Sequence, residues 1–156
     1  GAMVEIGCWE GRSLTVTAQL INPRIIHAVD HWKGNLTEGE SNPSILAAQE
    51  RDVYTTFRHN TECLNGNVQI HRADWKDWIR DWDQPIAFLH LDASHDYQSV
   101  FDCLVAIKPF LVSGAIACGD DAYADEVWRG ACDAFGGGVE KIGERLWLWH
   151  QDAKNA

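Results

Sequence analysis

The stretch VEIGCWEGRS, residues 4–13, decides how the rest of the chain is interpreted. It begins as a short apolar segment, passes through a turn that contains Gly7 and Gly11, and enters a helical pattern at Arg12. A strand that leads through a glycine turn into a helix lets the backbone approach a bound ligand closely. Glu5 is unusual in an apolar strand, because a buried carboxylate needs a specific hydrogen-bonding partner. The stretch therefore predicts a pocket for a nucleoside-type cofactor.

Strand and helix patterns alternate through the remainder of the chain, which predicts an α/β fold. We expect a doubly wound, mostly parallel, seven-stranded Rossmann-like sheet that ends in an antiparallel hairpin, with ligands at the carboxyl ends of the strands. After the first strand, the expected strands are 25–30, 68–73, 86–92 and 115–119, followed by a hairpin of 139–142 and 145–150 around a Gly143-Glu144 turn. The expected helices are 12–21, a single helix from 42 to 64 that is stopped by 65–67, and then 74–82, 97–107 and a helix through about 135.

The length of 156 residues predicts one domain, assigned to residues 4–150. Gly1 to Met3 is interpreted as an expression scar ahead of that domain. No apolar run has the length of a transmembrane helix and no signal segment is recognisable, so we expect a cytoplasmic protein that does not enter a membrane.

The charge and the cysteines exclude further classes of protein. The net charge is −10, from 13 lysines and arginines against 23 acidic residues, which would repel a nucleic-acid backbone. The 5 cysteines are odd in number and form no CxxC pair, which argues against a disulfide framework and a zinc site. The sequence leaves open whether the chain is a monomer or a homo-oligomer.

A second acidic residue supports the cofactor interpretation of the glycine turn. Asp30 ends the second expected strand, where a carboxylate can accept the hydroxyl protons of a ribose. Trp9 stands where a dinucleotide-binding turn needs a small residue beside the pyrophosphate. A cofactor without phosphates fits the turn better.

The turn resembles that of class I S-adenosylmethionine-dependent methyltransferases, in particular the metal-dependent, family 24-like O-methyltransferases. The pattern is Glu-aliphatic-Gly-x-aromatic-x-Gly-x-Ser, matched here by Glu5, Ile6, Gly7, Trp9, Gly11 and Ser13. The resemblance implies that the turn and Ser13 hold the methionine moiety and that Asp30 holds the ribose. It also implies that Asp74 and Trp75 flank the adenine and that Asp92 borders the cofactor. For Asp74, a helix-capping role is an equally good interpretation.

A second group of acidic residues follows the fourth and fifth expected strands. Asp92, Asp120 and Asp121 stand at carboxyl ends that are expected to be neighbours, and three carboxylates at close range need a cation. Oxygen ligands of this kind suit Mg²⁺ or a similar divalent cation. The alternative is that Asp120 or Asp121 caps the following helix, although a cap needs only one such residue.

The same group resembles the metal site of that methyltransferase branch, most closely in its antibiotic- and sugar-modifying members. There, an aspartate after the fourth strand and an acidic pair after the fifth bind the metal. The residue three positions beyond the first aspartate is commonly the catalytic base, which here is His95. The alternative is a surface or cofactor-contacting histidine.

Together these residues predict methyl transfer from S-adenosylmethionine to an oxygen of a small hydroxylated acceptor, assisted by the metal. One alternative is a cofactor-binding module that is catalytically idle or needs a partner chain, because the covering helices typical of the family before the first strand do not occur in this sequence. A third interpretation, an NAD-dependent oxidoreductase, is disfavoured by Trp9 and by the terminal hairpin.

Overall fold

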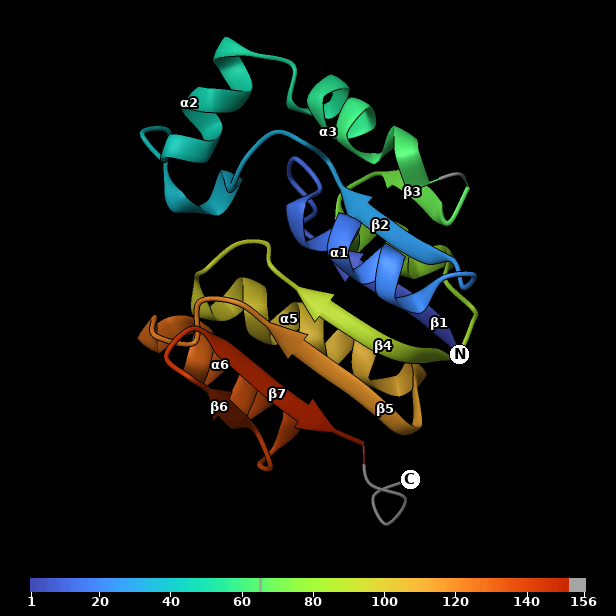
Figure 1. Ribbon diagram of the computed structural model, residues 1–156. Helices are drawn as coiled ribbons and strands as arrows, with labels where there is room; N and C mark the ends of the chain where they lie inside the picture. The colour runs from blue at the N-terminus through green and yellow to red at the C-terminus, as the bar shows by residue number, and fades with distance from the viewer. Residues whose placement is uncertain (65, 152–156) are drawn as a thin grey trace.

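A seven-stranded sheet with the strand order β3-β2-β1-β4-β5-β7-β6 runs through the protein (Figure 1). The computed structural model describes residues 1–64 and 66–151. The strands are β1 (Ala2–Ile6), β2 (Ile26–Asp30), β3 (Val68–Arg72), β4 (Ile86–Leu91), β5 (Leu111–Gly119), β6 (Glu140–Ile142) and β7 (Leu146–His150). The α-helices are α1 (Arg12–Ile21), α2 (Pro43–Glu50), α3 (Val53–Thr61), α4 (Trp75–Trp78), α5 (Tyr97–Ile107) and α6 (Asp125–Phe135).

The strand pairing confirms the predicted mixture of parallel and antiparallel strands. Strands β1 to β5 pair in parallel, and β7 runs antiparallel to both β5 and β6. Parallel neighbours need long crossover connections, which the helices provide. All five parallel strands therefore end at one edge of the sheet, where the loops that carry the acidic residues meet.

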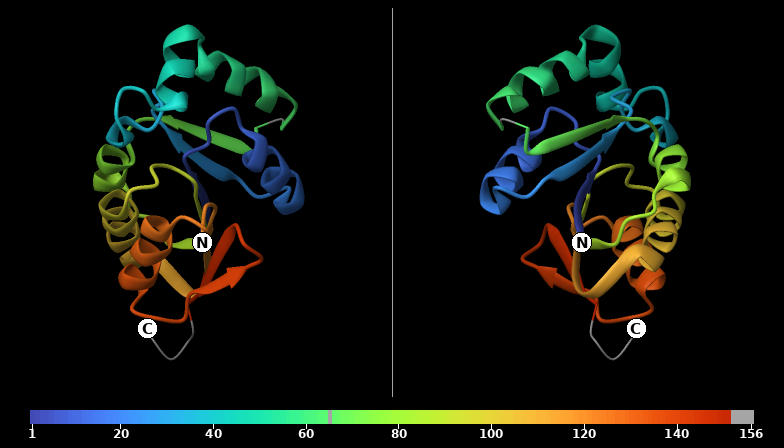
Figure 2. Two further views of the ribbon diagram at one scale, coloured as in Figure 1. Left: turned by 90° about the vertical axis from the view of Figure 1, so that its left-hand side faces the viewer. Right: turned by 90° about the vertical axis from the view of Figure 1, so that its right-hand side faces the viewer.

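Helices cover the sheet on two faces, as a doubly wound fold requires. Figure 2 shows α4, α5 and α6 on one side of the sheet and α1 and α3 on the other. Each layer has its own apolar core: Val4 and Ile6 of β1 point into the cluster with α5 and α6, whereas Met3 belongs to the cluster with α1 and α3. Alternate residues of one strand thus serve opposite layers, which also places Glu5 on the α1 side.

The first strand begins earlier than the sequence predicts. Ala2 and Met3 belong to β1, the backbone N–H of Ala2 donates to Pro85 O at 2.7 Å, and Met3 is buried. These residues continue the apolar pattern of the strand, so β1 begins at Ala2 and not at the expected Val4.

The expected single helix over residues 42–64 is two helices. The chain leaves helical geometry at Arg51, and the side chain of Asp52 caps α3 by accepting the backbone N–H of Thr55. Leu46, predicted to face the core, is 45% exposed, and Ile45 is buried in its place. Aspartate is a strong N-cap, and Asp52 starts a new helix here. The apolar residues before and after it are spaced as in one continuous helix, which is why the sequence predicts a single helix. The predicted stop signal at residues 65–67 includes residue 65, which lies outside the described residues.

Two further elements differ from their predicted bounds. Strand β5 begins at Leu111, four residues before the predicted start, and the hairpin turn contains three residues, Gly143 to Arg145, because Ile142 pairs with Leu146. The longer turn brings Arg145 to the ligand-binding edge of the sheet. Its backbone carbonyl accepts the N–H of Ala122 at 2.7 Å, which ties the hairpin to the loop after β5.

The terminal hairpin is held by aromatic packing. Trp147 and Trp149 of β7 are buried, and the Trp149 ring stacks on Phe135 of α6 with their centroids 4.1 Å apart. All 5 cysteines lie within the described residues and are free. Within residues 1–64 and 66–151, none of the helices combines the length and the hydropathy that crossing a bilayer requires.

Candidate cofactor and metal site

The turn after β1 requires glycine at residue 7. Gly7 has a φ of 85°, and a Cβ atom on it would lie 1.9 Å from the carbonyl oxygen of Asp92. Any side chain there would therefore push the loop after β1 away from the loop after β4. Gly11 has a φ of 84° and begins α1, where an added Cβ would meet Thr61 at 2.9 Å. The two glycines keep the turn compact and leave its outer side accessible.

Glu5 has the specific partners that its burial demands. It has no solvent exposure, and its Oε1 accepts a hydrogen bond from the Ser13 hydroxyl at 2.8 Å. Its Oε2 lies 3.3 Å from Nδ1 of His90, the residue beside it on β4. Burial would lower the pKa of His90, but the Glu5 carboxylate outweighs it and raises the pKa above its usual value. Glu5 therefore fixes the start of α1 to the centre of the sheet.

Asp30 joins the first two loops at the ligand-binding edge. Its Oδ2 accepts the backbone N–H of Trp9 at 2.8 Å, and its Oδ1 accepts that of Trp32 at 2.6 Å. The indole N–H of Trp32 in turn donates to Trp9 O at 2.7 Å. Each carboxylate oxygen retains a second lone pair, so Asp30 can organise the turn and still accept a ribose hydroxyl.

Left-handed backbone marks the same edge of the sheet. Within the described parts of the chain, the non-glycine residues with positive φ are Trp9 (46°), Trp32 (56°) and Asp121 (56°). They follow β1, β2 and β5, and bulky residues adopt this conformation at a cost of about 1 kcal/mol. Such strain persists where the surrounding contacts fix it, as the bonds around Asp30 do for both tryptophans.

Asp74 and Trp75 follow β3 as the sequence predicts. The side chain of Asp74 caps α4 by accepting the backbone N–H of Lys76 at 2.8 Å. Both residues also line the cavity described below, so capping and ligand contact are compatible at Asp74.

A cavity of about 910 Å³ opens at the carboxyl ends of the strands and unites the two groups of predicted residues. The predicted site residues that line it are Gly7, Trp9, Ser13, Asp30, Asp74, Trp75, Asp92, His95, Asp120 and Asp121. Glu5 and Gly11 are not among its lining residues, so they act on the cavity through the turn that they stabilise. A pocket of this size is sufficient for a nucleoside cofactor and a small second molecule.

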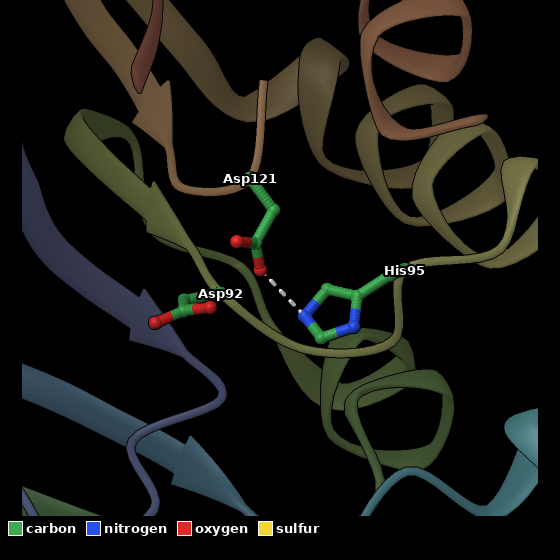
Figure 3. Close-up of side chains that lie close together, drawn as sticks. All are labelled: Asp92, His95 and Asp121. Carbon is green, nitrogen blue, oxygen red and sulfur yellow. Dashed lines mark ion pairs between the residues drawn. The ribbon is translucent and has the colours of Figure 1, made fainter. Parts of the chain in front are cut away.

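Asp92, His95 and Asp121 form an acidic and imidazole cluster on one wall of this cavity (Figure 3). One ligand atom of each residue lies within 4.8 Å of the other two. His95 Nε2 is 2.8 Å from Asp121 Oδ2, and the Asp92 carboxylate lies beside this pair. Two carboxylates and an imidazole at this spacing are a suitable donor set for a divalent cation.

Asp120 points to a different partner. Its carboxylate forms a two-point ion pair with Arg145, with Nη2 at 2.6 Å from Oδ2 and Nε at 3.2 Å from Oδ1. Arg145 also lies 3.8 Å from Asp121. The structure therefore groups His95, and not Asp120, with Asp92 and Asp121. The sequence argument that these carboxylates need a cation did not include Arg145, which the hairpin turn brings to the cluster.

The pKa values of the Asp92 and Asp120 carboxylates are shifted in opposite directions. Burial raises the pKa of Asp92 to about 6, with His90 opposing this effect and Asp120 adding to it. Burial acts in the same direction on Asp120, but the hydrogen bond from Arg145 outweighs it and lowers the pKa of Asp120 below the usual value. Near neutral pH, Asp92 therefore carries a charge that has few compensating partners, and this is where a cation would be stabilised most.

Glu38 is a member of the site that the sequence analysis missed. It lies in the loop between β2 and α2, and its Oε1 accepts the backbone N–H of His95 at 2.7 Å. The same oxygen is 3.2 Å from His95 Nδ1. The segment over residues 31–42 is polar, but nothing in the sequence indicates which of its carboxylates reaches the loop after β4.

The family match covers both groups of residues. A family model described as a methyltransferase domain matches residues 4–122, from the first strand to the paired aspartates. The chain belongs to the methyltransferase domain family. This match confirms the family suggested by the glycine turn, and the sheet order and terminal hairpin confirm the predicted fold.

Solved methyltransferase structures share the fold at low sequence identity. The O-methyltransferase NovP matches with a TM-score of 0.73 and 17% identity, over 97% of this chain and 72% of that protein. The calicheamicin methyltransferase CalS11 matches with a TM-score of 0.62 and 18% identity, over 96% and 72%. An O-methyltransferase from Bacillus cereus, solved in complex with SAH, matches with a TM-score of 0.63 and 15% identity, over 94% and 72%. A search of curated proteins finds no match to this methyltransferase.

Proposed function

We propose that this methyltransferase transfers a methyl group from S-adenosylmethionine to a hydroxyl oxygen of a small acceptor, with the assistance of a divalent cation. The observation that carries the proposal is that the glycine turn with Asp30 and the Asp92, His95 and Asp121 cluster open into one cavity. A cofactor on the turn would present its reactive group to an acceptor on the cluster.

The cofactor side of the cavity suits S-adenosylmethionine. The turn around Trp9 offers backbone close to the ligand, and Asp30 retains lone pairs for the ribose. Ser13 lines the cavity while its hydroxyl proton is engaged by Glu5, which leaves its oxygen to accept a donor such as an ammonium group. The Bacillus cereus relative was solved with SAH, the demethylated product of this cofactor, which supports the same ligand here.

The acceptor side supplies a base and acidic groups around it. His95 lines the cavity, and its Nε2 is 2.8 Å from Asp121, a contact that has to open before Nε2 can take the proton of an acceptor hydroxyl; Asp121 would then stabilise the resulting imidazolium. Asp92 and Asp121 are the carboxylates that would hold Mg²⁺ or a similar cation, with His95 beside them in the same cluster. When bound, the cation would lower the pKa of the acceptor hydroxyl.

The transfer itself needs alignment more than further chemistry. The acceptor oxygen attacks the methyl carbon, the bond from that carbon to sulfur breaks, and the neutral thioether SAH remains. The hydroxyl proton goes to His95 Nε2. Holding the two reactants in line within one cavity supplies most of the acceleration, because the step becomes effectively unimolecular.

A second candidate function is a cofactor-binding module that is catalytically idle or needs a partner chain. The observation that favours it is the set of ion pairs: Arg145 neutralises Asp120, and His95 pairs with Asp121, so the cluster is partly compensated by the chain itself. In this case the cofactor would bind at the turn and no hydroxyl would be methylated by this chain alone.

The two candidates are separated by a product assay. The protein is incubated with S-adenosylmethionine and panels of phenols, catechols and sugars, and SAH release is measured with Mg²⁺ and with EDTA. Acceptor-dependent SAH release that EDTA abolishes supports the proposed enzyme. Cofactor binding without release on any panel supports the idle module, and turnover unchanged by EDTA contradicts the metal-assisted mechanism.

A further inference from the structure

We propose that Arg145 is a resident cation of the candidate metal site, where it holds Asp120 outside the donor cluster and competes with a divalent cation for that carboxylate. The proposal rests on the function proposed above, because it concerns the metal site of that reaction. It gives the turn between β6 and β7 a direct influence on how tightly the site binds a metal ion.

The sheet places Asp120 next to Asp92. In the parallel pairing of β4 with β5, Leu91 lies opposite Gly119. Asp92 and Asp120 are the next residues after these partners, and both line the cavity. Neighbouring residues in register carry their side chains on the same face of a sheet. Backbone position alone would therefore make Asp120 a third carboxylate of the site, yet it lies outside the donor cluster.

Arg145 engages the carboxylate of Asp120 from the hairpin turn. Its Nη2 lies 2.6 Å from Oδ2 and its Nε lies 3.2 Å from Oδ1, so both carboxylate oxygens have a contact with the guanidinium. Oδ1 also accepts the backbone N–H of Asp121 at 2.8 Å. Two-point contacts between a guanidinium and a carboxylate are among the strongest ion-pair geometries. This contact explains why Asp120 does not join the cluster.

The same arginine adds positive charge where a cation would bind. Its Nη2 is 3.8 Å from Asp121 Oδ1, and its backbone carbonyl accepts the N–H of Ala122 at 2.7 Å, which fixes the turn beside the two aspartates. The Arg145 side chain is 67% exposed, so it can leave Asp120 for solvent at little cost when a divalent cation binds. Oxygen sites bind divalent cations according to the number of carboxylate charges that they offer. Arg145 therefore lowers the affinity of the site.

The test compares Arg145→Gln and Arg145→Lys with the control Arg80→Gln. Arg80 is similarly exposed, at 74%, pairs with Asp77 at 3.0 Å and does not line the cavity. Its replacement removes the same charge, and an arginine–aspartate contact, away from the site. The double variant Arg145→Gln with Asp120→Asn removes both members of the pair at the site. Mn²⁺ affinity is measured by EPR titration of each protein without cofactor or acceptor, and circular dichroism checks the fold.

We expect Arg145→Gln to raise the affinity for Mn²⁺ by roughly 10-fold, because a positive charge is removed and Asp120 is released to become a further ligand. Arg145→Lys keeps the charge and loses the two-point contact, so a smaller gain is expected. Arg80→Gln should bind Mn²⁺ as the wild type does. The double variant should return to about the affinity of the wild type, because it has no carboxylate to release.

Three results would overturn the proposal: Arg145→Gln binds Mn²⁺ no more tightly than the wild type, Arg80→Gln gains as much affinity, or the double variant keeps the gain. Should Arg145→Gln not fold, the comparison of Arg145→Lys with the wild type and Arg80→Gln decides in the same way.

The readouts also separate this proposal from the proposed function. Mn²⁺ binding is measured without turnover, so a gain in Arg145→Gln supports the role of Arg145 even where no methyl transfer is found. Conversely, methyl transfer that EDTA abolishes, with equal Mn²⁺ affinity in the wild type and Arg145→Gln, overturns the role of Arg145 and leaves the methyltransferase function standing.

Discussion

Glu5 and His90 lie side by side on the central strands β1 and β4, with Glu5 Oε2 3.3 Å from His90 Nδ1 and the carboxylate fully buried. The two atoms are close enough for an ion pair but are not aligned for a hydrogen bond, and neither has a hydrogen-bond partner among the described residues. The pair therefore depends on mutual attraction in a site from which water is excluded. Because Glu5 also holds Ser13, this pair connects the core of the sheet to the start of α1.

Breaking this pair from one side should be costly. His90→Leu leaves Glu5 as an unpaired buried charge, and we expect the free energy of unfolding to fall by about 3 kcal/mol or more at pH 7.5. The double variant Glu5→Met with His90→Leu removes both members of the pair, and we expect it to recover much of that loss. Urea denaturation of the three proteins measures both effects, and a double variant no more stable than His90→Leu would contradict the buried-pair interpretation.

Asp30 should matter for cofactor affinity. Asp30→Ala removes the ribose acceptor and releases the backbone N–H groups of Trp9 and Trp32, so we expect SAH affinity to fall by roughly 10- to 100-fold. Asp52→Ala is the control, because Asp52 caps α3 and does not line the cavity. That variant should lose about 1 kcal/mol of stability and keep its SAH affinity. Calorimetric titration measures the affinities, and equal affinities in wild type and Asp30→Ala would exclude the ribose contact.

The three aspartates of the cluster should not be equivalent. Asp92→Asn and Asp121→Asn are expected to reduce Mg²⁺-dependent turnover by roughly 100-fold or more while SAH still binds. Asp120→Asn should have a smaller effect, because Asp120 is engaged by Arg145 and lies outside the donor cluster. Turnover rates at saturating Mg²⁺ make the comparison. Equal losses at all three positions would instead support the set of three aspartates predicted from sequence.

A histidine pair beneath α4 should make stability depend on pH. His27 Nδ1 and His71 Nε2 are 3.0 Å apart, and the rings stack. Burial lowers the pKa of both rings. For His27, the neighbouring His71 lowers the pKa further. The unfolded chain therefore binds more protons just below pH 6.5, so this contribution to stability is complete above that pH and is lost as the pH falls.

The variant His71→Asn tests this dependence. We expect the free energy of unfolding to decrease less between pH 7.5 and pH 5 in His71→Asn than in the wild type, because one of the two titrating rings is gone. His59→Asn, which replaces an exposed histidine of α3, serves as the control and should behave as the wild type. An identical pH profile in wild type and His71→Asn would contradict a coupled pair.

The fold was predictable because its signals are local. Apolar strands, a glycine turn and proline or glycine stops recur along the chain, and together they predict the alternation that the structure shows. The break at Arg51 was missed because the apolar residues on either side of it share one helical spacing, which hides the cap at Asp52. Periodicity alone does not separate one long helix from two short ones.

The structure brings most of the candidate site residues to one cavity, but the sequence did not indicate how they pair with one another. His90 could have been noticed in the sequence. It is a polar residue inside an apolar strand, and it lies two residues before Asp92, so both side chains are expected on the same face of the sheet. The partnership of Asp120 with Arg145 depends on a hairpin turn one residue longer than predicted, and the contact of Glu38 with His95 depends on the path of a polar loop. Neither contact could be predicted from local sequence patterns, because each joins two segments that are distant along the chain.

The most direct test of the central claim is calorimetric titration of S-adenosylmethionine and SAH into the protein, with and without Mg²⁺. The account predicts saturable binding of both ligands at one site, with similar affinity for SAH in the presence and absence of Mg²⁺, and binding weakened by roughly 10- to 100-fold in Asp30→Ala. Absence of binding for both ligands under both conditions would contradict the assignment of the cavity to this cofactor.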